Sequence, residues 1–285
     1  MDKGADNNLP LIAIQGYEGS FHQEAAQIFW GNQIEVLPCD TFRALVKASE
    51  HDKKVTGALM AIENSIAGSI LPNYALLQKS SLVIVGEVYL HICQQLMANP
   101  GVQLSEIKEV HSHPMALLQC MDYLETNPSW KLIETEDTAL SARHIRQRHH
   151  KHTAAIASKL AAKLYGLDII APDIHTLQNN VTRFLVLQRR DEALPVADAN
   201  KASVNFVTDH SKGSLARVLA SIAGGDVNLS KLQSVPIPGS DFLYSFHADM
   251  EYENQQQLDT VLQEIIRQTR SLTVFGQYKK GMLQK

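Results

Sequence analysis

Short apolar segments recur along the first two thirds of the chain, and each one ends in a polar turn followed by a helical pattern. Residues 11–14, 35–38 and 58–62 have the length and composition of buried strands, and apolar residues at helical spacing follow each of them. This alternation restricts the possible architectures, because it is typical of strands joined by crossover helices. The sequence therefore predicts an α/β fold with a mainly parallel sheet.

The same alternation continues toward residue 190. Pro114 suits the first turn of a helix over 115–124, and Gly166 suits the end of a helix over 159–165. Residues 83–88, 90–92 and 168–171 are expected to form strands. Residues 131–133 and 154–157 are expected to begin either strands or helices.

The composition of the chain changes after residue 190. Residues 191–200 are charged, small and proline-containing, which is typical of a linker. Beyond it, strand patterns at 202–207, 227–232, 242–249 and 272–278 enclose helical patterns at 214–223 and 255–268. This βαββαβ order predicts a ferredoxin-like domain.

Charge and composition exclude several classes of protein. The 285 residues carry a net charge of -4, so no general basic field favours nucleic acid, and the basic run 143–152 is expected to be a solvated helix end. The three cysteines lack metal-ligand spacing, and their odd number suits a reducing compartment. Residues 1–6 lack the apolar core of a signal peptide, and no apolar run approaches the ~20 residues of a membrane span. We expect a cytoplasmic protein without a membrane partner.

Polar side chains gather where the predicted strands end, which is where small ligands usually bind in α/β folds. The hexapeptide 179–184, Asn-Asn-Val-Thr-Arg-Phe, leads into the apolar strand 184–187. It can hold an anion and donate a hydrogen bond, but Asn-Asn also suits a simple turn, and the local sequence does not decide between them. The glycine patterns of nucleotide-binding loops are absent, which argues against a nucleotide-dependent oxidoreductase.

Four of these loops, taken in order, resemble motifs of the prephenate dehydratase family with a C-terminal ACT domain. The loops are 16–21, 62–69, 112–120 and 180–184, and the resemblance extends over residues 11–278. It implies two α/β lobes of the periplasmic-binding-protein type with an active site in the cleft between them. The implied domains are a catalytic domain at 9–190, the linker at 191–200 and a regulatory ACT domain at 201–280.

The resemblance also implies a reaction. Prephenate loses carbon dioxide and hydroxide to give phenylpyruvate, a step of phenylalanine biosynthesis that needs no metal and no organic cofactor. The enzyme must hold a dianion and must protonate or hydrogen-bond the leaving oxygen. No long helical chorismate mutase segment is evident, so we expect no fusion to that activity.

Three residues form the expected catalytic set. By resemblance Thr182 is the key residue, and its hydroxyl suits a short hydrogen bond in a water-poor cleft. The alternative for Thr182 is a strand residue whose hydroxyl caps a neighbouring carbonyl. Asn64 and Gln119 resemble substrate-binding residues of the family, and neutral amides orient a substrate without bringing a competing charge.

Hydroxyl and amide groups around this set are expected to bind the substrate or shape its loops. Ser20, Ser65 and Ser112 can supply hydroxyl or backbone donors, and the family often has threonine where Ser20 stands. Asn180 is expected to shape the turn beside Thr182.

Three charged or titratable residues have two interpretations each. The resemblance implies that Glu63 lies near the substrate, and a carboxylate beside a dianion must be protonated, paired with a cation or turned away. The alternative is that Glu63 buttresses its loop. His113 can act as a general acid or can shape the loop before Pro114, the role that we favour. Arg183 can pair with a substrate carboxylate or with a structural acid.

Two further residues beside this set have no expected catalytic role. Cys120 is expected to be a packed thiol, because nothing near it in sequence activates it. Many family members have histidine near the position of Gln94, so the role of that histidine is not assigned to any residue of this chain.

In the resembled family the ACT domain binds phenylalanine between paired domains and inhibits the enzyme. The family's Glu-Ser-Arg-Pro motif is here Gln233-Ser234-Val235-Pro236, which removes two charges. Regulation by phenylalanine is therefore expected with altered affinity, through a homodimer or homotetramer, and the alternative is a domain that serves only as a dimer interface. The expected effector residues are Gly213, Ser214, Leu215, Asn228, Leu229 and Ser234.

Two other functions stay open. An arogenate dehydratase performs the same chemistry on the amino-acid form of the substrate. A non-enzymatic protein that senses or binds amino acids also fits two lobes and an ACT domain. A hydroxyl at Thr182 together with Asn64 and Gln119 favours an enzyme, because a binder does not need that set.

Overall fold

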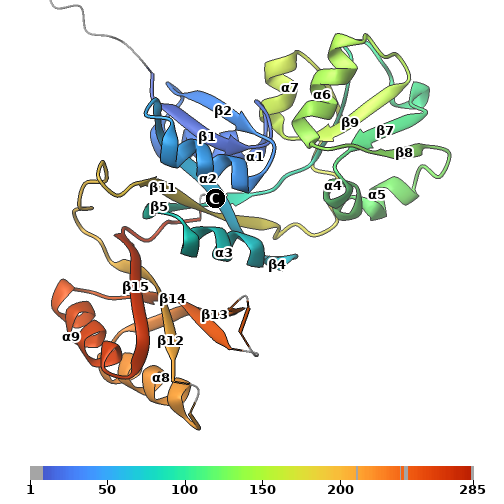
Figure 1. Cartoon of the computed structure of the whole chain (residues 1–285). Helices are drawn as coiled ribbons and strands as arrows, with labels where there is room; N and C mark the ends of the chain where they lie inside the picture. The colour runs from blue at the N-terminus through green and yellow to red at the C-terminus, as the bar shows by residue number, and fades with distance from the viewer. Residues whose placement is uncertain (1–8, 210, 238, 241–242, 284–285) are drawn as a thin grey trace, which may run out of the picture.

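The computed structural model describes residues 9–209, 211–237, 239–240 and 243–283. Within these residues the strands form three sheets, which lie in two lobes and a C-terminal unit (Figure 1). Residues 1–6, which the sequence shows to be polar, and Phe242, which was expected to begin a strand, lie outside the described residues. No described helix is long and apolar enough to cross a membrane.

The first sheet forms the core of the first lobe, in the order β2-β1-β3-β11-β5, with β4 paired to β3. Strands β1, β2, β3 and β5 run in the same direction, in line with the expected mainly parallel sheet, but β11 lies between β3 and β5 and is antiparallel to both, so the sheet is mixed. The reason is that the chain leaves this lobe after β5 and returns in the opposite direction as β11. The strands are β1 (Leu11–Gln15), β2 (Glu35–Cys39), β3 (Val55–Asn64), β4 (Gly68–Ser69), β5 (Leu82–His91) and β11 (Val181–Arg189), and the helices are α1 (Phe21–Trp30), α2 (Phe42–His51) and α3 (Leu71–Lys79).

The second sheet, in the order β10-β6-β9-β7-β8, forms the second lobe. It is mixed as well, because β7 runs parallel to β8 and β9 whereas β6 is antiparallel to β9 and β10. Its strands are β6 (Gln95–Ala98), β7 (Glu109–Ser112), β8 (Lys131–Glu134), β9 (Thr153–Ala157) and β10 (Asp168–Ala171), and its helices are α4 (Pro114–Gln119), α5 (Met121–Glu125), α6 (Thr138–Gln147), α7 (Lys159–Tyr165) and the short 3-10 turn Leu104–Glu106.

The third sheet, in the order β13-β14-β12-β15, is antiparallel throughout, and its elements follow the βαββαβ order expected from the sequence. Helices α8 and α9 pack on one face of it, and the other face packs on the first lobe. Val235, Phe275 and Tyr278 of this face share a core with Leu77 and Ile84 of the first lobe. The elements are β12 (Lys201–Thr208), α8 (Ser214–Gly224), β13 (Asn228–Pro236), β14 (Tyr244–Glu251), α9 (Gln255–Ile266) and β15 (Thr269–Tyr278).

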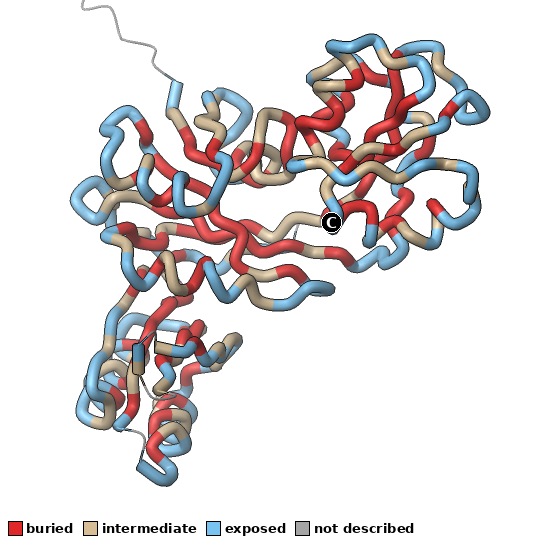
Figure 2. Tube along the Cα trace, turned by 45° about the vertical axis from the view of Figure 1, so that its right-hand side comes forward, coloured by how far each residue is buried: buried red, intermediate tan, exposed pale blue. Residues whose placement is uncertain are grey.

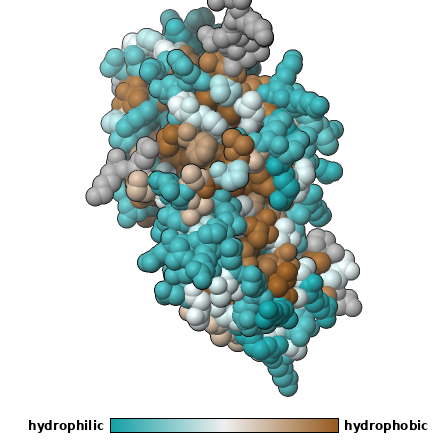
Figure 3. All heavy atoms as spheres, turned by 90° about the vertical axis from the view of Figure 1, so that its left-hand side faces the viewer, coloured by the Kyte–Doolittle hydropathy of each residue, from teal (hydrophilic) through white to brown (hydrophobic). Residues whose placement is uncertain are grey.

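Buried residues follow the strands of all three sheets (Figure 2). On the side that carries the segment 191–200, apolar surface gathers on a largely polar face (Figure 3). A groove on the protein surface is lined by that segment together with β5 and β15, through Val85, Leu194, Val196 and Val274.

Two local predictions differ from the structure. The helix expected over 115–124 is broken at Cys120, whose φ of -110° and ψ of 12° end α4 and begin α5. The strand expected from Phe184 begins at Val181, so Thr182 and Arg183 lie inside β11 rather than in a turn before it. By contrast, the helix over 159–165 is confirmed, with Gly166 at φ 61° after it.

Candidate active site

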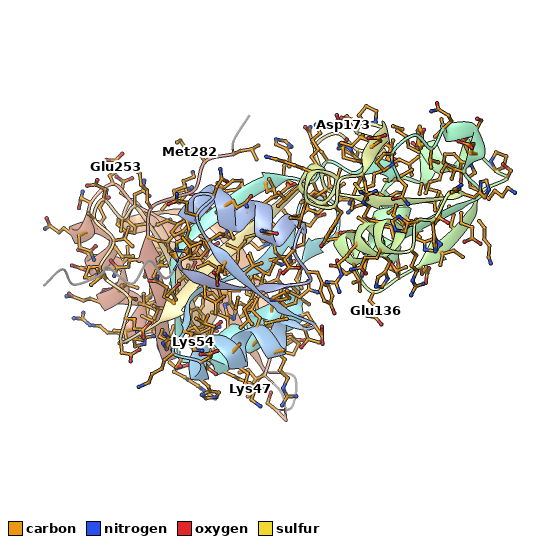
Figure 4. All side chains as sticks on the ribbon, turned by 90° about the horizontal axis from the view of Figure 1, so that it is seen from above. Lys47, Lys54, Glu136, Asp173, Glu253 and Met282 are labelled. Carbon is orange, nitrogen blue, oxygen red and sulfur yellow. The ribbon has the colours of Figure 1, made fainter. Side chains whose placement is uncertain are left out.

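A cavity of about 290 Å³ lies between the two lobes, lined by residues of both. The N-termini of two ten-residue helices open into it. Ser20 caps α1, where its hydroxyl accepts a hydrogen bond from the Gln23 amide, and Asp137 caps α6 by accepting from the Leu140 amide at 2.8 Å. Seen from above, Glu136 and Asp173 mark opposite sides of the junction between the lobes (Figure 4).

Thr182 and Asn64 face each other across paired strands at the floor of this cleft. They are register partners of β11 and β3, and the Asn64 Nδ2 donates to Thr182 Oγ1 at 3.0 Å. The Asn64 Oδ1 accepts from the amides of Ile66 and Ala67, at 3.0 and 2.9 Å, which fixes the orientation of the side-chain amide. Its Nδ2 also donates to Asn180 Oδ1 at 2.7 Å. Asn64 is therefore a rigid donor to Thr182.

The Thr182 hydroxyl is left with a proton to donate. Its oxygen accepts from Asn64, and among the described residues it has no acceptor of its own. A hydroxyl that accepts one hydrogen bond becomes a better donor of the next in a water-poor site. Within the part of the chain that the structure describes, this hydroxyl does not cap a carbonyl, which was the alternative for Thr182.

A β-bulge determines the direction in which the side chains around Thr182 point. The register shifts between Arg183 and Phe184, so Phe184 pairs with Ala61 and one extra residue of β3 is accommodated. Thr182, Phe184 and Ala61 consequently line the same cleft.

The second lobe brings two of the expected residues to the cleft. The His113 Nδ1 accepts from the Met115 amide at 3.2 Å and caps α4, so the ring shapes the loop as expected while it also lines the cleft. The Gln119 Oε1 accepts from Gln94 Nε2 at 3.3 Å. This bond leaves the Gln119 Nε2 group as the donor that faces the cleft.

Sequence reasoning missed three cleft residues, His22, Glu136 and Asp137. His22 packs between the rings of Phe42 and Phe184, and desolvation there lowers its pKa to about 3, so the ring is neutral at physiological pH. Burial raises the pKa of Asp137. An acidic residue before a helical pattern is a sequence signal for a cap, but it does not reveal that the cap faces the opposite lobe.

Arg183 does not line the cleft, so its prediction as a substrate-binding residue is corrected in favour of the structural alternative. Its guanidinium is 6% exposed. It pairs with Glu87 of β5 at 2.7 Å and with Asp249 of β14. Neighbouring residues of a strand point to opposite faces, so Thr182 in the cleft requires Arg183 to point away from it.

Three further expected residues bind protein groups outside the cleft. Glu63 pairs with Lys231 of β13. The Ser65 hydroxyl donates to the Asn179 carbonyl at 2.7 Å, and the buried Ser112 hydroxyl donates to the Ile156 carbonyl at 2.6 Å. These side chains stabilise the loops instead of facing the cleft. Asn180 is buried beside the cleft and is linked to it through Asn64 and through the Ile92 amide, which donates to the Asn180 carbonyl.

Cys120 is a packed thiol, as expected. Its side chain is fully buried, and burial raises its pKa to about 12, so it stays protonated at neutral pH.

The expected effector residues lie in two places of the third unit. Gly213, with φ 77°, caps α8, and Ser214 and Leu215 begin that helix. Asn228, Leu229 and Ser234 lie on β13, the edge strand of the sheet. Asn228 and Ser234 are exposed.

The close approach of Gly16 to Asp137 predicts a mutational effect. Gly16 has φ 88°, and a Cβ there would lie 2.6 Å from Asp137 Oδ2. Gly16→Ala should cost about 1–2 kcal/mol in unfolding free energy from backbone strain and should also lower catalytic turnover by displacing Asp137. Gly101→Ala is the matched control, because Gly101 has φ 84° with nothing near its Cβ. Equal turnover in the two variants would contradict a role for the Asp137 position.

The sequence and the fold match known proteins. The family model described as prephenate dehydratase matches residues 12–192. The chain is 40% identical to arogenate dehydratase 2 of Petunia hybrida, over 79% of this chain and 57% of the relative. It is 36% identical to arogenate dehydratase/prephenate dehydratase 2, chloroplastic, of Arabidopsis thaliana, over 93% of this chain and 70% of that relative. The chain thus spans roughly three fifths to two thirds of these relatives' lengths.

Two solved structures resemble the whole chain. One is described as GqqA, a novel type of quorum quenching acylases, with TM-score 0.85, 30% identity and coverage of 95% of this chain and 98% of that one. The other is a prephenate dehydratase in complex with L-Phe from Arthrobacter aurescens, with TM-score 0.83, 27% identity and coverage of 94% and 89%.

Proposed function

Because this chain belongs to the prephenate dehydratase family, a family of carbon–oxygen lyases, we propose that it converts prephenate to phenylpyruvate. The observation that carries this proposal is the Thr182 hydroxyl, which is held by Asn64 and is free to donate into an apolar cleft. A non-enzymatic amino-acid binder has no use for this arrangement.

The reaction requires a hydrogen-bond donor at one place. The bond to the ring carboxylate breaks, and its electron pair forms the last double bond of the aromatic ring as the bond to the ring hydroxyl breaks. Carbon dioxide leaves, and the departing hydroxide takes up a proton to become water. Thr182 donates to that oxygen as its charge develops, which lowers the barrier of the step.

The cleft also suits the body of the substrate. Phe42, Phe184, Ile92 and Met115 supply apolar surface for the ring. The first turn of α1, after Ser20, leaves backbone N–H groups without helical acceptors, and such groups bind carboxylates well. Gln119 adds a neutral donor from the second lobe.

Arogenate is the second candidate substrate, and one observation favours it. Among the described residues that line the cleft there is no lysine or arginine, whereas Glu136 and Asp137 both line it. Arogenate carries an ammonium group in place of the side-chain ketone of prephenate, and a carboxylate near that group would attract it.

The two substrates are distinguished by kcat/KM measured for each on the same purified protein. Formation of phenylpyruvate from prephenate supports the main proposal, and a larger kcat/KM for arogenate, with phenylalanine as product, assigns the cleft to that substrate. Turnover of neither one would overturn the proposed function.

We propose that residues 201–280 form an ACT domain that binds phenylalanine, after a catalytic domain at 9–190 and a linker at 191–200. The βαββαβ order supports this, and the Arthrobacter relative was solved with L-Phe. The unpaired edge of β13 would join two chains into a homodimer or homotetramer. We also propose that the protein is located in the cytoplasm. Titration with phenylalanine tests the proposed binding. If phenylalanine causes no inhibition and no shift in Tm, the unit serves only as an assembly element.

A further inference from the structure

Two adjacent residue pairs of β3 and β11 face opposite sides of the first sheet. Thr182 lies opposite Asn64 in the register, and Arg183 lies opposite Glu63. Because side chains alternate along a strand, the first pair faces the cleft and the second faces the third sheet. Asn64 and Thr182, which face the cleft, are therefore direct sequence neighbours of Glu63 and Arg183, whose side chains contact the third sheet.

Arg183 is bonded to three strands at once. Its Nε donates to Glu87 Oε2 of β5 at 2.7 Å, and its Nη2 donates to the Tyr278 hydroxyl of β15 at 3.1 Å. Its Nη1 pairs with Asp249 of β14. A guanidinium with so many fixed partners has little freedom to adjust, so Arg183 is a physical link from β14 and β15 to the backbone of β11.

Glu63 forms the second contact of the third sheet with these strands. Lys231 of β13 pairs with Glu63 and also donates to Ser69 Oγ of β4 at 2.8 Å. Lys231 lies two residues before Gln233, where the expected effector motif begins. The side chains of Lys231 and Glu63 are 18% and 31% exposed, so they are only partly buried and can be exchanged without disrupting a core.

We propose that Glu63 and Arg183 are positioning residues through which the third sheet sets the geometry of the Asn64–Thr182 hydrogen bond. This proposal rests on the proposed function, because it assigns the control of that same site. A displacement of 1 Å at a reacting group lowers rates about a hundredfold. A ligand or partner that moves β13 or β14 would therefore change turnover more than substrate binding.

Reversal of the Glu63–Lys231 charges tests the proposal. We expect Glu63→Lys and Lys231→Glu each to lower kcat by about tenfold, with KM changed by less than about twofold. The double variant restores the ion pair with the charges exchanged, and its kcat should return to within about threefold of the original. The rescue separates a positioning role from a general loss of stability, because two independent defects would add.

Arg267→Glu is the matched control. Arg267 pairs with Glu264 at 3.9 Å at the end of α9, on the face of the third sheet that points away from the first lobe. It should leave kcat unchanged. Single reversals at Glu63 and Lys231 that leave kcat unchanged would overturn the proposal, and so would a double variant no better than the singles.

A readout that does not need turnover separates this proposal from the proposed function. Backbone amide hydrogen exchange in 63–69 and 180–184 should increase in each single reversal and return in the double variant. Unchanged exchange in the single variants would contradict the coupling, even if the protein proves active. A protein that shows this exchange pattern but no turnover would support the coupling and would contradict only the proposed reaction.

Discussion

Replacement of Thr182 by alanine should lower kcat by about 10²- to 10³-fold, the usual effect of removing one donor aimed at a developing oxyanion. The loss arises because Thr182 Oγ1, held at 3.0 Å from Asn64 Nδ2, is the donor expected to face the leaving oxygen. Stability should fall by only about 1 kcal/mol, because Asn64 keeps its bond to Asn180. Steady-state kinetics and thermal unfolding of the same preparations measure the two effects.

Two variants at the same position serve as controls. Thr182→Ser keeps the hydroxyl and should retain turnover within about tenfold, whereas Thr182→Val keeps the shape but lacks the donor and should behave like alanine. A valine variant with full turnover, or an alanine variant that loses stability as severely as activity, would show that Thr182 is structural.

Replacement of Arg183 by leucine should have the largest effect on stability. It leaves Glu87 and Asp249 buried without their shared cation, although Lys201 still lies 3.0 Å from Glu87. Removing one partner of a buried ion pair costs about 3–5 kcal/mol, which lowers Tm by roughly 10 °C in a chain of this size. Glu192→Gln is the control, because it removes the solvent-exposed partner of Arg189, whose guanidinium keeps its hydrogen bonds to the Ser49 and Asp52 carbonyls. It should cost less than about 1 kcal/mol.

The pH dependence of this loss identifies its cause. Burial alone would raise the pKa of Asp249, but the charges of Arg183 and Lys201 outweigh it and hold that pKa below its ordinary value. The pair therefore stabilises the original protein above about pH 4 and loses this effect as pH falls further. In the leucine variant burial dominates, so protonation of Asp249 relieves the buried charge and the difference in Tm should shrink from pH 7 toward pH 4. A difference that stays constant would mean that lost packing explains the effect.

Short sequence motifs predicted much of the site, because the structure of each one depends on a few neighbouring residues. Ser20 and Asn64 come just after apolar runs that can be read as strands, and Thr182 comes just before one. The structure brings these residues to one cleft with Gln119. Their mutual placement depends on the return of the chain as an antiparallel β11, which apolar runs do not reveal.

The errors have physical causes at particular residues. A strand read from Phe184 left Arg183 free to face the substrate, whereas a strand from Val181 places it opposite to Thr182 by simple alternation. Asp137 and His22 were missed because their roles depend on how the two lobes meet, and no local pattern records this contact.

We propose that this cleft removes both carbon dioxide and water from prephenate. The direct test incubates the purified 285-residue chain, treated with a chelator, with prephenate and measures carbon dioxide and phenylpyruvate together. We predict equal molar amounts of the two, formed at a rate proportional to enzyme concentration. No release of either product above the uncatalysed rate would contradict the account.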